Sequence, residues 1–157
     1  MKFKITLKVN RKFGDLLPFN YQYEQSAVIY RILAQADTQY SSWLHENGYL
    51  LHERKRFKLF CYSPFIFEKV KPLPEAGCLN IIGEKAVWYI SFIPEKSTLE
   101  FIQGIFAHQS FTIGNKEHRV AFDVVGVEAI PMPQLSEEMA FVALSPICVK
   151  LHEDNKT

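Results

Sequence analysis

Residues 2–9, KFKITLKV, decide the fold that the chain can adopt. Apolar side chains occupy every second position of this stretch, and lysine or threonine occupies the positions between them. Because successive side chains of a strand point to opposite faces of a sheet, this alternation predicts a β-strand that is buried on one face only. Its other face is basic, so a second layer of structure is expected on the apolar side alone.

Two helices are predicted after this strand. Residues 23–36 carry apolar side chains at helical spacing, and Asn20 stands where it can cap that helix. Residues 38–46 predict a second, shorter helix, in which we expect Trp43 and Leu44 to pack inward. Both helices thus come between the first strand and the next one.

Further strands and one more helix are predicted downstream. Ser97 is expected to cap the helix, and its apolar face would consist of Leu99, Ile102 and Phe106. Gly83 predicts a hairpin between the strands on either side of it. The strands are expected at residues 58–67, with a break at Pro64, and at 79–82, 86–93, 117–129 and 139–151, and the helix is expected at 98–108.

This order of elements indicates a fold of the α+β class. It suits a ferredoxin-like βαββαβ sandwich, also called RRM-like, in which two helices cover one face of an antiparallel sheet. We expect this domain to occupy residues 1–133. Residues 134–157 would add one extra C-terminal strand and a tail, which lead into a missing second ferredoxin-like domain.

The composition is that of a soluble globular protein, with 48% apolar and 22% charged residues in a chain of 157. No apolar run approaches the roughly 20 residues that span a bilayer, and the N-terminus lacks the apolar core of a signal peptide. We therefore expect a cytoplasmic protein with no membrane partner.

The cysteines predict neither disulfide bonds nor a metal site. They are 3 in number, which is odd, and Cys61, Cys78 and Cys148 lie far apart in the sequence. No cluster of histidine, cysteine and acidic residues has the spacing of a zinc site either. No metal and no other cofactor is therefore expected.

Positive charge is concentrated in one short run, although the net charge of the chain is only +1. Residues 52–58, HERKRFK, contain four fixed positive charges and one negative charge. Such a patch can neutralise several phosphates of a nucleic acid, and its simpler interpretation is a solvated loop. The candidate phosphate contacts are Arg54, Lys55 and Arg56 in the run, His52 beside them, and Arg31 in the first predicted helix.

Tyr30, His45 and Lys58 are the candidate catalytic residues. A histidine moves protons near neutral pH, a tyrosine is a phenol and a lysine is a fixed cation. His45 falls in the last turn of the second predicted helix, which Asn47 and Gly48 terminate. Attack of a ribose 2′-hydroxyl on the adjacent phosphate needs a base, an acid and positive charge, and these groups can supply them without a metal. Each residue also has a simpler role, in packing, on the surface or at the start of a strand.

Four stretches of the sequence resemble the CRISPR repeat-processing endoribonucleases of the Cas6 family. In chain order they are NYQYEQSAVIYRIL at 20–33, LHENGY at 44–49, KLFCYSPF at 58–65 and LSPICVK at 144–150. The resemblance covers only the N-terminal half of such a protein. Family members carry a second ferredoxin-like domain with a glycine-rich loop that holds the RNA, and the scattered glycines of this chain form no such loop.

The resemblance implies a function and a role for each candidate residue. His45 would be the general acid or base, Tyr30 would assist it, and Lys58 would stabilise the charged phosphate. Which of His45 and Tyr30 is the base stays open. The products would be a 2′,3′-cyclic phosphate and a 5′-hydroxyl. CRISPR repeat RNA, or the guide RNA made from it, is the implied partner, and other CRISPR effector subunits are further candidates.

Other functions stay open at this point. An N-terminal fragment or short form would cleave poorly, because half of the phosphate contacts would be lost. The chain would otherwise be a non-catalytic CRISPR-RNA-binding module of the same fold, or a regulatory domain with no role in RNA. A homodimer is a separate hypothesis, because an unpaired last strand offers its edge to a second copy.

Overall fold

β1 (Lys2–Asn10) is the central strand of the main sheet and is buried on one face only. Its side chains at positions 3, 5, 7 and 9 are all shielded from water, whereas those between them are exposed or half-buried. The alternation at the start of the sequence thus predicted this strand correctly. The computed structural model describes residues 1–51, 55–134, 136–140 and 142.

The other strands of the main sheet are β5 (Phe60–Tyr62), β6 (Ile66–Phe67), β9 (Lys85–Phe92), β10 (Ser110–Gly114) and β11 (Arg119–Ile130). Neighbouring strands are all antiparallel, in the order β10-β11-β1-β9-β5, and β6 also pairs with β9. Pro64 separates β5 from β6, which confirms the predicted break. β10 was not predicted, because its five residues show neither strict alternation nor a turn signal before them.

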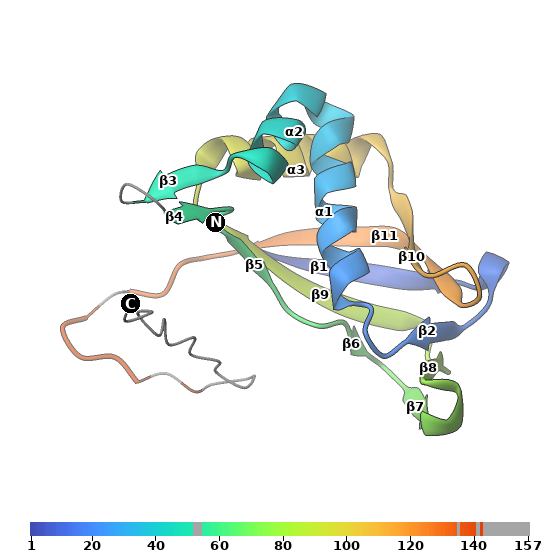
Figure 1. The fold of residues 1–157 in the computed structure, drawn as a ribbon. Helices are drawn as coiled ribbons and strands as arrows, with labels where there is room; N and C mark the ends of the chain where they lie inside the picture. Colours follow the sequence, from blue (N-terminus) through green and yellow to red (C-terminus); the bar gives the residue numbers. More distant parts are fainter. Residues whose placement is uncertain (52–54, 135, 141, 143–157) are drawn as a thin grey trace, which may run out of the picture.

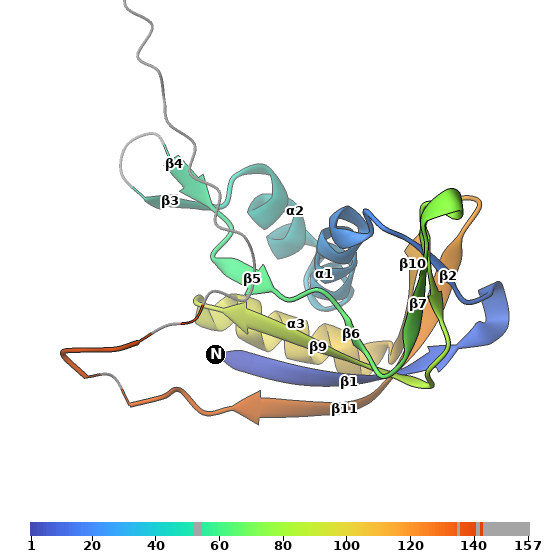
Figure 2. The same cartoon turned by 90° about the horizontal axis from the view of Figure 1, so that it is seen from below.

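All three helices lie on the same face of this sheet (Figures 1 and 2). They are α1 (Gln22–Ala36), α2 (Thr38–Glu46) and α3 (Glu95–Ala107). Each predicted helix is confirmed, but both predicted N-caps are wrong. α1 begins after Tyr21 with no side-chain cap, and the Ser97 hydroxyl, buried inside the first turn of α3, is hydrogen-bonded to that of Tyr40 instead.

The smaller elements lie beside the main sheet. They are β2 (Leu16–Pro18), β7 (Val70–Leu73) and β8 (Cys78–Ile81) in one small sheet, β3 (Tyr49–Leu51) and β4 (Lys55–Phe57) in a hairpin, and 3₁₀ turns at Arg11–Phe13 and Pro74–Ala76. The predicted hairpin around Gly83 is wrong, because β8 pairs with β2 and β7 while β9 belongs to the main sheet. The guanidinium of Arg11 donates to the carbonyl oxygens of residues 81–83 and fixes the point where the chain passes between the two sheets.

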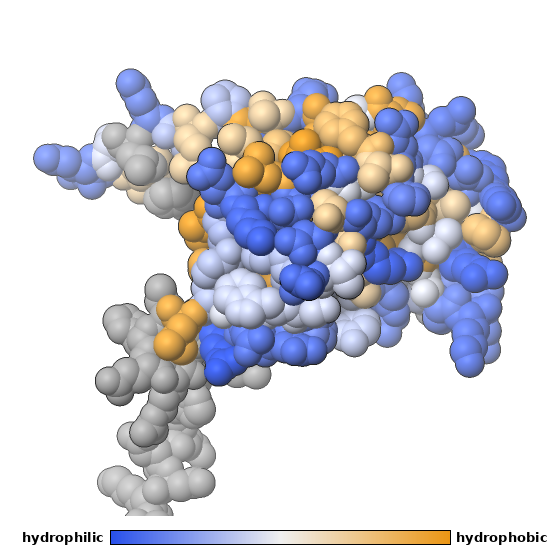
Figure 3. Space-filling view, turned by 90° about the horizontal axis from the view of Figure 1, so that it is seen from above, coloured by the Kyte–Doolittle hydropathy of each residue, from blue (hydrophilic) through white to orange (hydrophobic). Residues whose placement is uncertain are grey.

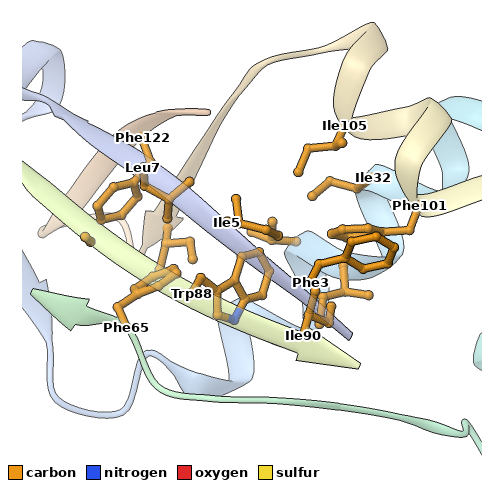
Figure 4. Close-up of a cluster of buried hydrophobic side chains, with 14 of the residues drawn as sticks. Phe3, Ile5, Leu7, Ile32, Phe65, Trp88, Ile90, Phe101, Ile105 and Phe122 are labelled. Atoms are coloured by element: carbon orange, nitrogen blue, oxygen red, sulfur yellow. The ribbon is translucent and has the colours of Figure 1, made fainter. Parts of the chain in front are cut away.

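The core fills the space between the main sheet and the helices (Figure 4). Ile5 of β1 lies at its centre, between Trp88 of β9 and the helical side chains Ile32 and Ile105. Phe101 of α3 and Phe92 of β9 are in contact, with ring centroids 4.9 Å apart. The sheet and the helices are therefore joined by large side chains from both layers.

β11 changes its buried residues part-way along. Val120 and Phe122 are buried, as the predicted strand at 117–129 requires. The pairing register with β1 then shifts between Thr6 and Leu7, and Val125 is 56% exposed. An extra residue at this bulge restores the apolar pattern of β11 two positions later, at Val127, which packs against the core.

The buried face of α3 differs from the predicted one. Ile102 packs against the core, as predicted. Leu99 and Phe106 are 55% and 61% exposed, whereas Phe101, Gly104 and Ile105 are buried. The reason is the close crossing of α1 and α3: a Cβ atom at Gly104 would lie 1.9 Å from the carbonyl oxygen of Ile32. Only the face of α3 that contains Gly104 can approach α1 this closely. Leu99 and Phe106 therefore lie on the exposed face of α3, and apolar and charged side chains are mixed on the helical side of the molecule (Figure 3).

Two expectations concern the chain ends and the membrane. Most of the strand predicted at 139–151 lies outside the described residues, and the described residues 139, 140 and 142 are not in a strand. Within the described ranges, no helix has both the length and the apolar character needed to cross a membrane.

Gly104→Ala is expected to destabilise the protein by about 3 kcal/mol, because the new methyl group meets the backbone of α1. Gly126→Ala is the matched control, since a Cβ there lies 3.7 Å from Thr6 in ordinary contact. Urea unfolding followed by circular dichroism measures both. Equal unfolding midpoints for the two variants would show that the helices can separate without loss.

Candidate active site

α1 and α2 are joined by a single residue, Asp37, and this tight link folds the end of α2 back against α1. The carboxylate of Asp37 caps α2 by accepting a hydrogen bond from the backbone N–H of Tyr40 at 2.8 Å. Further along α2, the hydroxyl of Ser41 donates to the backbone carbonyl of Tyr30 at 2.8 Å. The two helices are therefore held together next to Tyr30.

Tyr30 and His45 are in direct contact. Their ring centroids are 4.9 Å apart, and the ring planes meet at 80°. Tyr30 is half-buried, whereas His45 is exposed. The imidazole is thus open to a ligand from solvent, and the phenol lies behind it. Trp43, which was expected to pack inward, is 39% exposed on the same helix, while Leu44 is buried as predicted.

Lys58 binds the carboxyl end of α2. Its ammonium group donates hydrogen bonds to the backbone carbonyl oxygens of Leu44 and His45. The last carbonyl groups of a helix have no partner within the helix and carry partial negative charge, so a cation is favourable there. Lys58 is therefore fixed beside His45 through the backbone of that residue.

Gly48 allows this close approach. Its φ is +67°, and a Cβ atom there would lie 2.8 Å from the carbonyl oxygen of Phe57. A glycine is needed on both counts, because other residues resist a positive φ and would collide with β4. The predicted end of the helix at Asn47 and Gly48 is confirmed, and the same glycine brings Lys58 within reach of α2.

Phe60 completes the site from the other side of Tyr30. The two rings are 5.7 Å apart between centroids and meet at 76°. Between Lys58 and Phe60 the chain passes through Leu59, whose φ is +56°; it is the one non-glycine residue with a positive φ in the described ranges. That conformation costs on the order of 1 kcal/mol for a leucine. It turns the chain so that Lys58 reaches α2 while Phe60 reaches α1.

The surroundings shift the pKa values of two of the three groups. Burial, and secondly the nearby Tyr62, raise the pKa of Tyr30, so its hydroxyl keeps its proton at neutral pH and acts as a hydrogen-bond donor. Burial, and secondly the nearby Arg56, lower the pKa of Lys58. An ammonium group has three N–H donors, and the carbonyls of Leu44 and His45 take two of them, which leaves one for an anion.

The basic run lies next to this site only in part. Arg56 is exposed, and its guanidinium donates to the side-chain oxygen of Asn47 at 3.0 Å, which keeps it at the end of α2. His52 and Arg54 lie outside the described residues, and so does the side chain of Lys55. Their contacts with RNA stay a prediction.

Arg31 is not part of this cluster. Its guanidinium donates to the backbone carbonyl of Thr112 at 3.0 Å and so ties α1 to β10. It also lines a separate hollow of about 400 Å³ between α1 and β10, together with Lys12 and Gln35. The structure therefore brings Tyr30, His45 and Lys58 together and leaves Arg31 apart.

Some features of the site escaped the sequence analysis. Phe60 lies in the stretch KLFCYSPF, two residues after Lys58 and two before Tyr62. This alternate spacing could have indicated that Phe60 belongs to the site. The left-handed Leu59 left no signal, because leucine gives no hint of that conformation. Cys61 is exposed and Cys78 is buried, both as free thiols. Among the residues described, no group of three or more His, Cys, Asp or Glu side chains is placed to hold a metal ion.

Comparison with known families decides where this arrangement belongs. Residues 16–123 match the family described as CRISPR-associated protein Cas6, N-terminal. The chain belongs to the Cas6 family. The matched region contains all three candidate catalytic residues, and the resemblance drawn from the sequence is confirmed.

Curated Cas6 relatives support this assignment. The chain is 27% identical over 140 residues to a putative CRISPR-associated endoribonuclease-like protein, Cas6nc, from Pyrococcus horikoshii, covering 88% of the chain and 52% of the relative. It is 26% identical over 147 residues to a CRISPR-associated endoribonuclease Cas6 from Methanocaldococcus jannaschii, covering 94% of the chain and 52% of the relative. The chain spans about half the length of the curated relatives it matches.

Solved structures share the fold. A Cas6-related protein from Pyrococcus furiosus superposes with a TM-score of 0.66 at 21% identity, covering 87% of the chain and 50% of the other. A structure described as an RAMP protein binding different RNA substrates gives 0.65 at 23% identity, with the same coverage of both chains. A CRISPR-associated protein Cas6 gives 0.57 at 27% identity, covering 86% and 50%. These likenesses agree with a mixed α/β fold that has an antiparallel sheet and three helices.

Arg56→Gln is expected to raise the pKa of Lys58, because it removes the neighbouring positive charge, the second cause of the lowered value after burial. The titration is measured from the ¹³Cε chemical shift of Lys58 in the NMR spectrum. Lys71→Gln, which removes a positive charge from exposed β7, is the control and should leave the titration of Lys58 unchanged. If Lys58 has the same pKa in the Arg56→Gln protein as in the wild type, the expected influence of Arg56 is contradicted.

Proposed function

We propose that this Cas6-family chain carries the catalytic groups of a metal-independent endoribonuclease that processes CRISPR repeat RNA. The observation that supports this most is the contact of the Tyr30 and His45 rings beside the ammonium of Lys58. A proton-transfer group, a hydroxyl donor and a cation thus meet at one exposed helix end. Cleavage by internal transesterification needs these three kinds of group.

In the proposed reaction, the ribose 2′-oxygen attacks the adjacent phosphorus while the bond from phosphorus to the 5′-oxygen breaks. A base removes the 2′ proton and an acid protonates the 5′-oxygen, which gives a 2′,3′-cyclic phosphate and a 5′-hydroxyl. His45 would take the 2′ proton as the base and return a proton to the 5′-oxygen as the acid. Burial raises the pKa of Tyr30, so its hydroxyl stays protonated and would donate a hydrogen bond to the phosphate. The remaining N–H of Lys58 would bind a non-bridging phosphate oxygen.

The proposal extends to the domain and the RNA path. Residues 1–133 would form a ferredoxin-like βαββαβ domain, which the strand order β11-β1-β9-β5 supports, with α1 and α3 as the two crossover helices. Residues 134–157 would lead into a second domain that completes the RNA groove. Arg56 would contact phosphate beside the cleaved bond, with His52, Arg54 and Lys55 along the same hairpin and Arg31 farther away. The reaction would take place in the cytoplasm.

A non-catalytic CRISPR-RNA-binding module is the second candidate function. The relative from P. horikoshii, described as a putative endoribonuclease-like protein, favours this alternative. Such a module would use the same basic hairpin to hold RNA. The endoribonuclease would cleave RNA in a reaction that needs His45, whereas the binding module would hold RNA without cleaving it. Substitution of His45, beside the wild type, therefore distinguishes the two functions.

His45→Ala is expected to lower the rate of repeat-RNA cleavage by about 10²–10⁴-fold and to leave RNA affinity unchanged. Cleavage is measured on a denaturing gel with the repeat RNA of the source genome in the presence of EDTA. His108→Ala is the matched control, because His108 is also an exposed histidine at a helix end. Equal cleavage rates for wild-type and His45→Ala would remove His45 from the mechanism. If wild-type protein saturates this RNA and still leaves it uncut, the chain by itself has only the binding function.

Tyr30→Phe is expected to slow cleavage by about 10²-fold while the protein keeps its stability, because the ring remains and only the donor is lost. Tyr23→Phe on the same helix is the control, since Tyr23 is 82% exposed and lies outside the site. Single-turnover rates with excess protein separate the chemical step from binding. Equal rates for both variants would remove Tyr30 from the mechanism.

A further inference from the structure

A groove of about 450 Å³ opens beside Lys58. Its lining combines two cations with apolar and small side chains: Arg56, Lys58, Phe57, Leu59, Phe60, Ile93, Cys61 and Ser91. Phe60 also touches Tyr30 through its ring. The groove and the catalytic cluster therefore share Lys58 and Phe60.

The apolar side chains around this groove are unusually exposed. Phe57 is 41% exposed and Ile93 is 78% exposed, although both are large and apolar. Exposed apolar surface next to a functional site commonly marks the binding of another molecule. The flat ring of Phe57 is suited to stacking against another planar group.

The charges at the groove restrict what can occupy it. Arg56 and Lys58 are both cationic and line the same hollow as the apolar side chains. A ligand that fits both must join a planar apolar group to an anion. A nucleotide of single-stranded RNA has this chemistry, because every base has a face that stacks and every phosphate binds cations.

Leu59 fixes the groove in position. Its backbone carbonyl accepts a hydrogen bond from the N–H of Ile93 at 3.0 Å, so the left-handed turn is tied to the residue that follows β9. The turn thus joins Ile93, in the apolar lining of the groove, to Phe60, which touches Tyr30, and to Lys58, which binds α2. This hydrogen bond helps to set the position of the groove in the folded protein without any contribution from the RNA.

We infer that this groove is a subsite for one unpaired nucleobase next to the cleaved phosphate, with Phe57 as its stacking platform. The inference rests on the proposed function and gives it a specificity: the nucleotide at the cut is single-stranded, and its base leaves the stack of its neighbours. Arg56 and Lys58 hold the phosphate of that nucleotide while the base lies against Phe57 and Ile93.

The test uses the whole chain and the repeat RNA of its source genome with 2′-fluoro riboses, which lack the nucleophile and cannot be cut. A single abasic nucleotide is moved along this RNA, and affinities are measured by fluorescence anisotropy. We expect wild-type protein to lose about tenfold in affinity when one particular base is missing. Phe57→Ala should lose about tenfold on the intact RNA and no more on that abasic RNA, because both changes remove the same contact.

Two variants control this experiment. Phe57→Tyr keeps the ring and should bind as wild type. Phe106→Ala removes an exposed phenylalanine of α3 that does not line the groove, and should change nothing. The sensitive nucleotide should flank the cut found with unmodified RNA. If Phe57→Ala binds the RNA with wild-type affinity, as expected of a groove that binds protein instead, the inference is overturned. It is also overturned if the loss of affinity from Phe57→Ala adds to the loss from the missing base at every abasic position.

Failure of the proposed function has a different signature. If the protein saturates unmodified RNA without cutting it, and the losses from Phe57→Ala and from one abasic position still do not add, the groove binds a base and the catalytic role is contradicted. Cleavage by Phe57→Ala with the wild-type rate and affinity contradicts the subsite alone.

Discussion

Phe3, Ile5 and Leu7 place three large apolar side chains on one face of the central strand, and none of them exposes more than 4% of its surface. This face has to be covered, and α1 and α3 cover it together. They meet closely because Gly104 has no side chain to hold their backbones apart. The crossing fixes how α1 is turned about its axis, and with it the direction in which Tyr30 points toward α2.

The same charged group serves the fold and the proposed chemistry. Lys58 stabilises the carboxyl end of α2 by binding its unpartnered carbonyl groups, which is a favourable place for a cation in any helix. That contact also holds the ammonium at the backbone of His45, whose side chain is exposed. The proposed phosphate contact uses the one ammonium N–H that does not bind a carbonyl of α2. The structural role of Lys58 and its proposed role in binding phosphate are therefore compatible.

Local patterns in the sequence predicted most helices and strands. The features that the sequence did not predict depend on contacts between segments that are distant in the chain. Alternation was sufficient for β1, and helical spacing was sufficient for α1 and α2. The partners of β8 depend on pairing between distant segments, and the buried face of α3 depends on a close approach at Gly104 that outweighs the larger apolar side chains. The family resemblance selected Tyr30, His45 and Lys58 as candidates. How Lys58 reaches α2 depends on the left-handed Leu59, which no pattern of residue types indicates.

β5, which carries Phe60 of this site, is a short edge strand of the main sheet. β5 meets β9 through three residue pairs at one edge, Phe60 with Phe92, Cys61 with Ser91 and Tyr62 with Ile90. Short edge strands open at a much smaller free-energy cost than the central strands of a sheet. Brief detachment of β5 would carry Phe60 away from Tyr30 while β1 and the core stay folded. The arrangement in which Phe60 touches Tyr30 would then be one sub-state of the native protein, and its population would change with temperature or denaturant before the domain unfolds.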